Sequence, residues 1–207
     1  VVVVATSNFE PERLYEGGLQ RERFTPFIAL LKSRLDVLDL GPGIDYRLNR
    51  LRSLRVYHAP LDARAAAALD SAFTALTEGA EPGPDTLLVK GRRLEVAEAA
   101  RGIARFTFEE LCERPLGAGD YLAIATHFHG IVLSGIPRLG PDKRNEARRF
   151  MTLIDALYEH RVKLIASAAA LPESLYPTGD GAFEFQRTVS RLNEMQSAAY
   201  LEREHLT

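Results

Sequence analysis

The sequence predicts an α/β protein built around a parallel sheet, and three observations support this fold class. The chain opens with a β-branched run, Val1–Ala5, bounded by polar residues, which is typical of a buried strand in a parallel sheet. Between residues 130 and 166, apolar runs flank an amphipathic segment, and this strand–helix–strand order indicates parallel pairing through crossovers. Of 207 residues, 46% are hydrophobic and 26% are charged, which excludes disordered and collagen-like chains.

The first elements are predicted from helix-start and turn signals. Glu10-Pro11-Glu12 is typical of a helix start, because proline suits the first helical position and acids suit the first turn. The segments that follow, in order, are a helix over 20–33, a short strand over 35–40, a strand or helix over 45–57, and an alanine-rich helix over 60–77.

The strongest linker signal is Thr77–Asp85, which concentrates glycine and proline. Beyond it we expect, in order, strands over 86–108 joined near Gly91 and Gly102, a helix over 120–127, a strand over 130–136, an amphipathic helix over 145–161, a strand over 162–166 and a final helix over 185–204. This organisation divides the chain into residues 1–58, a helix and linker over 59–86, and an α/β region over 87–207.

Charge and residue counts limit the chemistry. The net charge of −2 disfavours nucleic acid as a partner, and no apolar run approaches the length of a transmembrane segment. The single cysteine, Cys112, excludes an internal disulfide and suits a reducing compartment. A P-loop needs Gly-Lys-Ser/Thr, because the lysine must reach the phosphates and the hydroxyl must bind Mg²⁺. None of the four lysines follows a glycine, so the chain contains no such phosphate cradle.

Polar residues at the end of the first strand form the strongest local candidate for a site. Thr6-Ser7-Asn8 lies at the carboxyl end of Val1–Ala5, where open α/β sheets bind ligands. The Asn8 amide can hold a water or a phosphate oxygen, or it can cap the following turn. Arg21 and Arg23 lie near the start of the next helix, where a guanidinium can reach a phosphate or remain on the surface.

Short motifs recur along nearly the whole chain. They include Val1–Asn8, Pro11, Leu14-Tyr15, Gly18-Leu19-Gln20-Arg21, Pro26-Phe27-Ile28, Asp45-Tyr46-Arg47, Arg114-Pro115-Leu116-Gly117, Arg148-Arg149-Phe150, Arg187-Thr188 and Glu194-Met195-Gln196-Ser197. In this order they resemble the ZapE cell-division ATPases and their mitochondrial AFG-like relatives, which belong to the AAA+ group. The resemblance implies the end of a P-loop NTPase sheet, followed by an extended C-terminal α/β region with a helical C-terminus.

The resemblance also implies roles for individual residues. Asn8, with Ser7 beside it, resembles the sensor that reads the γ-phosphate and orients the attacking water. Arg21 resembles the arginine finger donated to a neighbouring subunit, with Arg23 as the alternative finger. Arg187 or Arg191 resembles a second sensor that contacts the nucleotide from the C-terminal helix.

The implied reaction is hydrolysis of ATP to ADP and phosphate with Mg²⁺, in a homo-oligomer assembled through the arginine finger. The resemblance implies FtsZ or another protein client as partner, and a cytoplasmic location in bacteria or the mitochondrial matrix in eukaryotes. It leaves peripheral membrane association open. We expect the P-loop to precede Val1 in a longer protein, and this chain alone to be inactive. The alternative is a non-catalytic protein-interaction module or pseudo-ATPase.

Three further clusters have simpler explanations. His127 and His129 could bind a metal, but a third ligand is missing, so two partly buried histidines are favoured. Ser134, Asp120 and His127 lack the Gly-x-Ser-x-Gly context of a hydrolase. The arginines Arg144, Arg148 and Arg149 are better explained as a solvated or internally paired face than as a binding patch.

The sequence also contains an internal similarity. Shifted by about 161 positions, Ala5 and Pro11 recur as Ala166 and Pro172, whereas Asn8 corresponds to Ala169. A repeated strand–turn–helix unit and chance similarity both remain open explanations.

Overall fold

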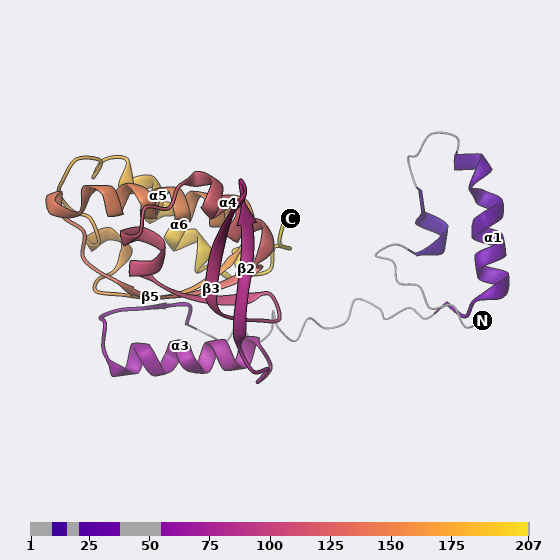
Figure 1. The fold of residues 1–207 in the computed structure, drawn as a ribbon, viewed down its shortest axis with the longest axis horizontal. Helices are drawn as coiled ribbons and strands as arrows, with labels where there is room; N and C mark the ends of the chain where they lie inside the picture. Colours follow the sequence, from indigo (N-terminus) through magenta and orange to yellow (C-terminus); the bar gives the residue numbers. More distant parts are fainter. Residues whose placement is uncertain (1–9, 16–20, 38–54, 207) are drawn as a thin grey trace. The chain divides into compact units, whose positions relative to one another are not determined.

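The computed structural model describes residues 10–15, 21–37 and 55–206. They fall into two compact units, one within Val1–Asp45 and one within Tyr46–Thr207, and each is described by itself (Figure 1). The predicted strand Val1–Ala5 lies outside the described residues, as do half of 35–40 and most of 45–57.

In the first unit, the described residues form η1 (Pro11–Arg13), η2 (Arg21–Arg23) and α1 (Thr25–Arg34). The predicted helix over 20–33 is therefore confirmed, as a 3₁₀ turn followed by an α-helix. The Glu10-Pro11-Glu12 signal marks only a short 3₁₀ turn. Phe24 joins the elements, because its ring centroid lies 5.5 Å from that of Tyr15 and 5.2 Å from that of Phe27.

The second unit is a mixed sheet with helices on both faces. Its elements are β1 (Tyr57–His58), α3 (Ala63–Leu76), β2 (Gly83–Val89), β3 (Arg92–Ala100), β4 (Ile103–Thr107), η3 (Glu109–Glu113), α4 (Ala118–His127), β5 (Gly130–Ile136), η4 (Pro141–Lys143), α5 (Arg144–Glu159), β6 (Lys163–Ala168), η5 (Pro172–Ser174), α6 (Phe185–Met195) and α7 (Ala198–Leu201). The strand order is β1-β6-β5-β4-β3-β2, in which β1, β6, β5 and β4 pair in parallel. The predicted α/β class with parallel pairing is confirmed.

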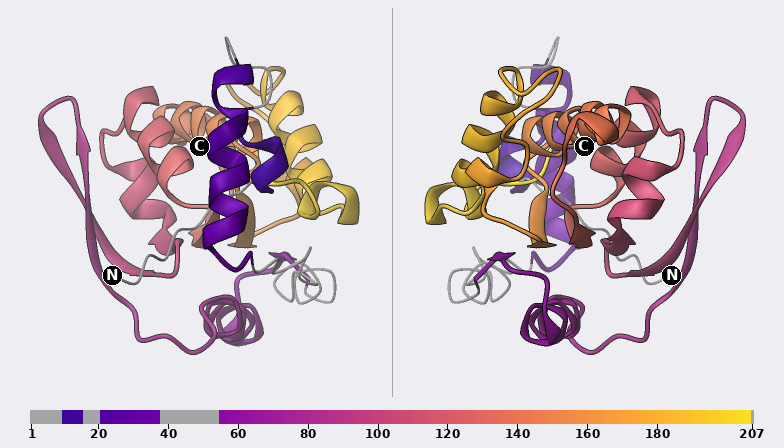
Figure 2. Two further views of the ribbon diagram at one scale, coloured as in Figure 1. Left: turned by 90° about the vertical axis from the view of Figure 1, so that its right-hand side faces the viewer. Right: turned by 90° about the vertical axis from the view of Figure 1, so that its left-hand side faces the viewer.

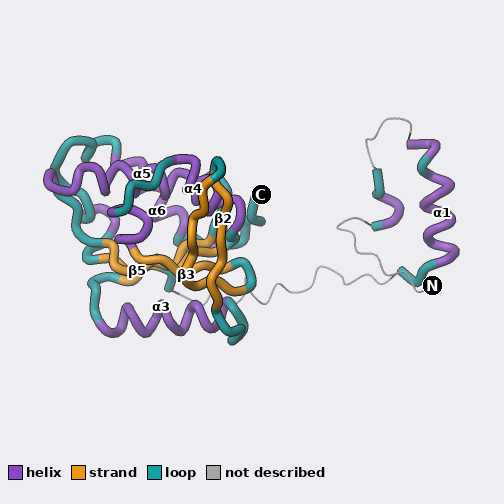
Figure 3. The backbone as a smooth tube through the Cα atoms, viewed as in Figure 1, coloured by secondary structure: helices purple, strands orange, loops and turns teal. Residues whose placement is uncertain are grey.

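The sheet lies between two helical layers, with α3 on one face and α4, α5 and α6 on the other (Figures 1 and 3). Alternate residues of the central strands divide the core accordingly, since successive strand side chains point to opposite faces. Val132 and Ile165 pack with α3, whereas Ile131 and Leu133 belong to the larger core beneath α4, α5 and α6.

Several predicted elements match the structure closely. The strand over 130–136 coincides with β5, and the helix over 145–161 corresponds to α5. The helix over 60–77 is α3, which begins after Asp62 because its carboxylate accepts a hydrogen bond of 2.8 Å from the Ala65 amide. The strand junctions near Gly91 and Gly102 are also confirmed, since both glycines have positive φ in tight turns.

The linker prediction is wrong over part of its length, because β2 begins at Gly83 and includes Pro84. Proline is tolerated there since β2 is an edge strand of the described sheet, in which β3 is its one neighbour. A register shift between Gly83 and Asp85 also interrupts the ladder at this point. The β2–β3 hairpin extends away from the helical layers (Figure 2).

Two other boundaries differ from the sequence-based expectation. The single helix expected over 185–204 is divided into α6 and α7, because the Ser197 hydroxyl caps a new helix through the Tyr200 amide at 3.1 Å. Phe108, expected to share a strand with Phe106, lies beyond the end of β4 at a π-helical turn. Both phenylalanines are nevertheless buried in the same core.

Candidate functional site

Arg21 opens η2 and is held by the preceding turn. Its Nη2 donates a hydrogen bond to the backbone carbonyl of Glu12 in η1. Its backbone carbonyl accepts bonds from the Phe24 amide at 2.8 Å and the Thr25 hydroxyl at 3.3 Å. The Nε atom is buried and has no hydrogen-bond partner among the described residues. The packing of η1 against α1 therefore positions the guanidinium.

Arg23 is exposed, and no side-chain partner is found for it among the described residues. The Lys32 ammonium hydrogen-bonds to the Glu12 carboxylate and lowers the pKa of Glu12. This contact links η1 directly to α1, in addition to the contact between Arg21 and Glu12. Ser7 and Asn8, the predicted sensor residues, lie outside the described residues, so the structure does not place them relative to Arg21 or Arg23.

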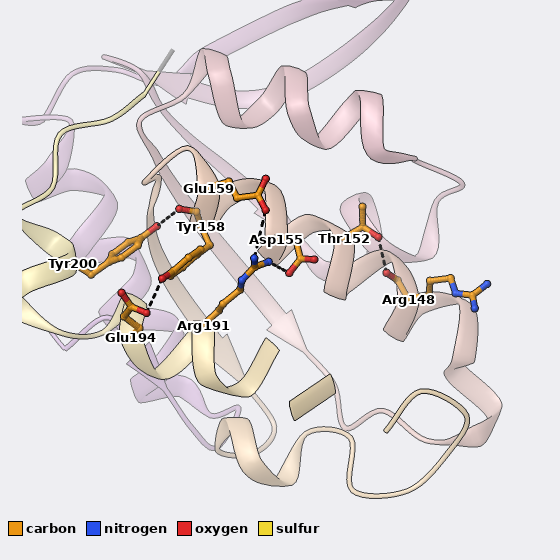
Figure 4. Close-up of polar contacts among 8 residues, drawn as sticks. All are labelled: Arg148, Thr152, Asp155, Tyr158, Glu159, Arg191, Glu194 and Tyr200. Carbon is orange, nitrogen blue, oxygen red and sulfur yellow. Dashed lines mark hydrogen bonds and ion pairs between the residues drawn. The ribbon is translucent and has the colours of Figure 1, made fainter. Parts of the chain in front are cut away.

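Arg191, a predicted second sensor, is an internal cation. It has 9% of its surface exposed and forms ion pairs with Asp155, and with Glu159 at 3.4 Å, on α5 (Figure 4). Its guanidinium carbon also lies 4.9 Å from the centroid of the Tyr158 ring. These contacts join α6 to α5 and neutralise part of the acidic face of α5.

The Arg191 cluster continues toward the C-terminus through aromatic and polar contacts. The Tyr158 hydroxyl donates to Glu194 at 2.7 Å, which raises the pKa of Tyr158 and lowers that of Glu194 (Figure 4). The Tyr158 ring stacks on Tyr200 of α7, with centroids 5.5 Å apart. Arg191 is therefore one member of a network that fixes α6 and α7 on α5.

Arg187, the other predicted second sensor, lies one turn before Arg191 on α6 but in different surroundings. It is exposed, its side chain has no hydrogen bond or ion pair among the described residues, and it lines a cavity of about 440 Å³. We name this the α5–α6 cavity. Its walls are formed by side chains of two helices and the preceding loop, namely Met151, Asp155, Phe183, Glu184, Gln186, Arg187 and Thr188. Sequence reasoning missed this cavity.

The structure does not bring together the residues of the alternative metal and hydrolase sites. Among the described residues no group of three or more His, Cys, Asp or Glu could hold a metal ion. His127 contacts Asp85 at 3.1 Å, whereas His129 contacts the Arg101 carbonyl at 3.0 Å. Ser134 donates instead to the Phe106 carbonyl at 3.4 Å, so it is not activated by His127.

The arginine patch at the start of α5 is largely paired, as expected. Arg144 contacts Asp180 at 2.9 Å, and Arg149 donates to the Cys112 carbonyl at 2.6 Å. Arg148 is exposed and has no side-chain partner among the described residues. Burial raises the pKa of the Cys112 thiol, so this cysteine is not a reactive thiolate. None of the helices that the structure describes is long and apolar enough to cross a membrane.

The internal similarity extends to local structure. η1 and η5 are both 3₁₀ turns that open with a proline, Pro11 and Pro172. They are closed in the same way, by Leu14 and Leu175 amides that donate to the proline carbonyls at 3.3 Å. Ala169, the counterpart of Asn8, offers no polar side chain. The second copy of the similar segment therefore lacks a sensor-like amide at the matching position.

Comparisons with known proteins identify the family. A model of the AFG1-like ATPase family matches residues 1–204. The "Cell division protein ZapE" of Escherichia coli K12 is 38% identical over 206 residues, covering 100% of this chain and 55% of the relative. "Lactation elevated protein 1 homolog B" of Danio rerio is 37% identical over 235 residues, covering 97% of this chain and 47% of the relative. No solved structure matches the chain.

The chain thus spans about half the length of the curated relatives that it matches. The match of the family model nevertheless extends over nearly all of this chain, which confirms the resemblance found in its motifs. We conclude that the chain belongs to the AFG1-like ATPase family.

Proposed function

We propose that this chain supplies the γ-phosphate sensor and the trans-acting arginine of an oligomeric ATPase that converts ATP and water to ADP and phosphate. Family membership over residues 1–204 is the observation that carries the proposal. Because the sequence contains no Gly-Lys-Ser/Thr, the P-loop in this proposal comes from another segment of the protein.

The arginines of this chain suit the phosphates of ATP, whereas no acidic cluster for its metal ion is found in the part of the chain that the structure describes. Guanidinium groups bind phosphate oxygens well, and the Arg21 guanidinium at the start of η2 is positioned by its hydrogen bond to the Glu12 carbonyl. Mg²⁺ prefers several oxygen ligands, and no cluster of three acidic residues lies among the described residues. We therefore assign no Mg²⁺ ligand among the described residues.

In the proposed mechanism, the Asn8 amide orients the attacking water and Ser7 supports the same strand end. Arg21 donates hydrogen bonds to the γ-phosphate held by a neighbouring subunit and stabilises the charge that develops as the bond to the leaving oxygen breaks. Arg23 is the alternative finger, because it is exposed two residues further along the same turn.

Neither Arg187 nor Arg191 is included in this proposal. Arg191 is already paired with Asp155 and Glu159, and a contact with phosphate would break those ion pairs. Arg187 is free, but it lies beside Phe183 and Met151, which suit a protein ligand better than a triphosphate.

The finger assignment is tested by Arg21→Ala in the ATPase that contains this chain, or in this chain combined with a P-loop-bearing segment. We expect the turnover number to fall by about 10³–10⁵-fold, as for other trans-acting arginines. Arg34→Ala, at the exposed end of α1, is the matched control and should keep full activity. If Arg21→Ala hydrolyses ATP normally and Arg23→Ala does not, the finger is Arg23.

A second experiment tests whether Arg21 acts on the nucleotide of a neighbouring subunit. Asn8→Ala subunits and Arg21→Ala subunits should each be inactive, whereas their mixture should regain activity, because some sites then combine an intact sensor with an intact finger. No recovery would place both residues in the same subunit's site. Complete absence of hydrolysis with an added P-loop segment would favour the alternative, a non-catalytic interaction module or pseudo-ATPase.

The name of the Escherichia coli relative supports a role in cell division for a bacterial ATPase of this kind. The partner that follows from the sequence resemblance is FtsZ or another protein client. This part of the proposal is tested by co-sedimentation of the ATPase with FtsZ filaments in the presence of ATP. Failure to co-sediment would contradict the FtsZ partner and leave the ATPase assignment untouched.

A further inference from the structure

Two cations of the first unit converge on Glu12 in η1. Its backbone carbonyl accepts a hydrogen bond from Arg21 Nη2, and its carboxylate forms an ion pair with the Lys32 ammonium. Lys32 lies in the last turn of α1, where the helix dipole favours a cation. Because one residue receives both cations, a shift of Glu12 would displace the acceptor of Arg21.

The ion pair also affects the charge that surrounds Arg21. The hydrogen bond from Lys32 lowers the pKa of Glu12, so the carboxylate stays ionised and occupied. Arg21 binds the carbonyl of the same residue, which is a neutral acceptor. A carboxylate partner would offset the positive charge of the guanidinium and weaken its attraction for a phosphate. With Lys32 on the carboxylate, the charge of Arg21 is not offset at this contact.

An equivalent contact occurs in the second copy of the similar segment. The Asn193 side chain donates a hydrogen bond of 2.7 Å to the Glu173 carboxylate. Both contacts join residues 20 positions apart, and each links a 3₁₀ turn to a residue two positions before the end of the following α-helix. Glu12 corresponds to Glu173, and Lys32 to Asn193, at the shift of about 161 positions. The link between turn and helix is therefore a shared feature of both copies, and in the first copy a cation forms it.

We propose that Lys32 is a positioning residue for the arginine finger and acts through Glu12. Lys32 holds the Glu12 carbonyl in place as the acceptor of Arg21, and it keeps the Glu12 carboxylate occupied. The guanidinium then remains available to the γ-phosphate of the neighbouring subunit. This inference rests on the proposed function and deepens it, because it adds a residue that supports the finger without contact with the nucleotide.

The first test is Lys32→Met in the ATPase that contains this chain, with Arg21→Ala measured beside it. We expect the turnover number to fall by about fivefold or more, since small displacements of a catalytic group are costly. The loss should be smaller than that for Arg21→Ala, because the finger itself remains. KM for ATP should not change, since the P-loop-bearing segment holds the nucleotide. Lys32→Arg should keep activity, because it retains a cation that can reach the carboxylate.

Asn193→Ala is the matched control. It removes the equivalent contact with Glu173 in the second copy, where the shift of about 161 positions matches Arg21 with Ala182. The turnover number should therefore stay unchanged. Lys32 and Asn193 are both exposed, so the fold should survive either substitution, and circular dichroism checks this.

A mixing experiment separates the positioning role from a general effect on structure. In a mixture of Asn8→Ala and Arg21→Ala subunits, the Asn8→Ala subunits supply the fingers and the Arg21→Ala subunits supply the working sites. Lys32→Met should lower the recovered activity when the Asn8→Ala subunits carry it. It should have no effect when the Arg21→Ala subunits carry it, because those subunits supply no finger.

Two results would overturn the positioning role alone. One is a Lys32→Met turnover number equal to that of the unmodified ATPase, and the other is an equal loss whichever subunit of the mixture carries Lys32→Met. In both cases a large loss for Arg21→Ala would leave the proposed function standing. Normal hydrolysis by Arg21→Ala, or a mixture that recovers no activity even without Lys32→Met, would contradict the proposed function and the positioning role together.

Discussion

Lys163 is a buried cation that has no carboxylate partner among the described residues. Only 7% of its surface is exposed, and its ammonium donates to carbonyls that include those of Arg161 at 3.1 Å and Tyr200 at 3.2 Å. Burial, and to a smaller extent the nearby Arg161 and Arg203, lowers the pKa of Lys163 from its ordinary 10.5 to about 8. The side chain thus holds the end of α7 against β6 at the cost of desolvating a charge.

This environment predicts a pH dependence of stability. Between pH 8 and 10.5 the unfolded chain binds a proton at Lys163 that the folded chain has released, so the free energy of unfolding rises with pH. The gain should be absent in Lys163→Met. The measurement is urea unfolding of both proteins at several pH values in this window, with Lys90→Met, at the exposed hairpin turn, as the control. A difference between the two proteins that does not change with pH would contradict the expectation.

At the scale of elements, Arg191 connects α6 to α5. Replacing it by alanine removes hydrogen bonds to Asp155 and Glu159 and leaves the two carboxylates four residues apart on one helix. Because both acids retain access to water, we expect a loss of about 1–3 kcal/mol in the free energy of unfolding, rather than the larger cost of a fully buried orphan charge.

Arg187→Ala is the matched control for this substitution, since Arg187 lies one turn earlier on α6 and has no partner among the described residues. It should change the free energy of unfolding by less than about 0.5 kcal/mol. Chemical denaturation measures both variants. Equal losses for the two would mean that the Asp155 and Glu159 contacts contribute nothing net to stability.

At the scale of the whole molecule, residues 46–207 contain both hydrophobic core clusters. A segment with its own complete core is expected to fold independently. We therefore predict that residues 46–207, expressed alone, unfold in a single cooperative transition, measured by calorimetry and near-ultraviolet circular dichroism. Loss of the near-ultraviolet signal with retention of helical content would show that this unit needs the rest of the chain for its packing.

The local pattern of the sequence was sufficient to predict most elements of the second unit. The positions of β5, α3 and α5 follow from apolar periodicity and capping residues, which act over a few residues. The boundary at Ser197 could have been predicted from its side chain alone, since serine is a preferred capping residue. The strand at Pro84 could not, because whether a proline is tolerated depends on which side of the strand has a neighbour.

The candidate site, like the fold, was predictable from the sequence only in part. The sequence by itself determined the family and the residue types that suit phosphate chemistry, because these depend on motifs read in order along the chain. Only the tertiary structure decided that Arg191 is paired while Arg187 is free, and that Phe183 stands beside a cavity. Arg191 meets Asp155 from 36 positions away, and charge pairing, burial and cavities all arise from such contacts between distant segments.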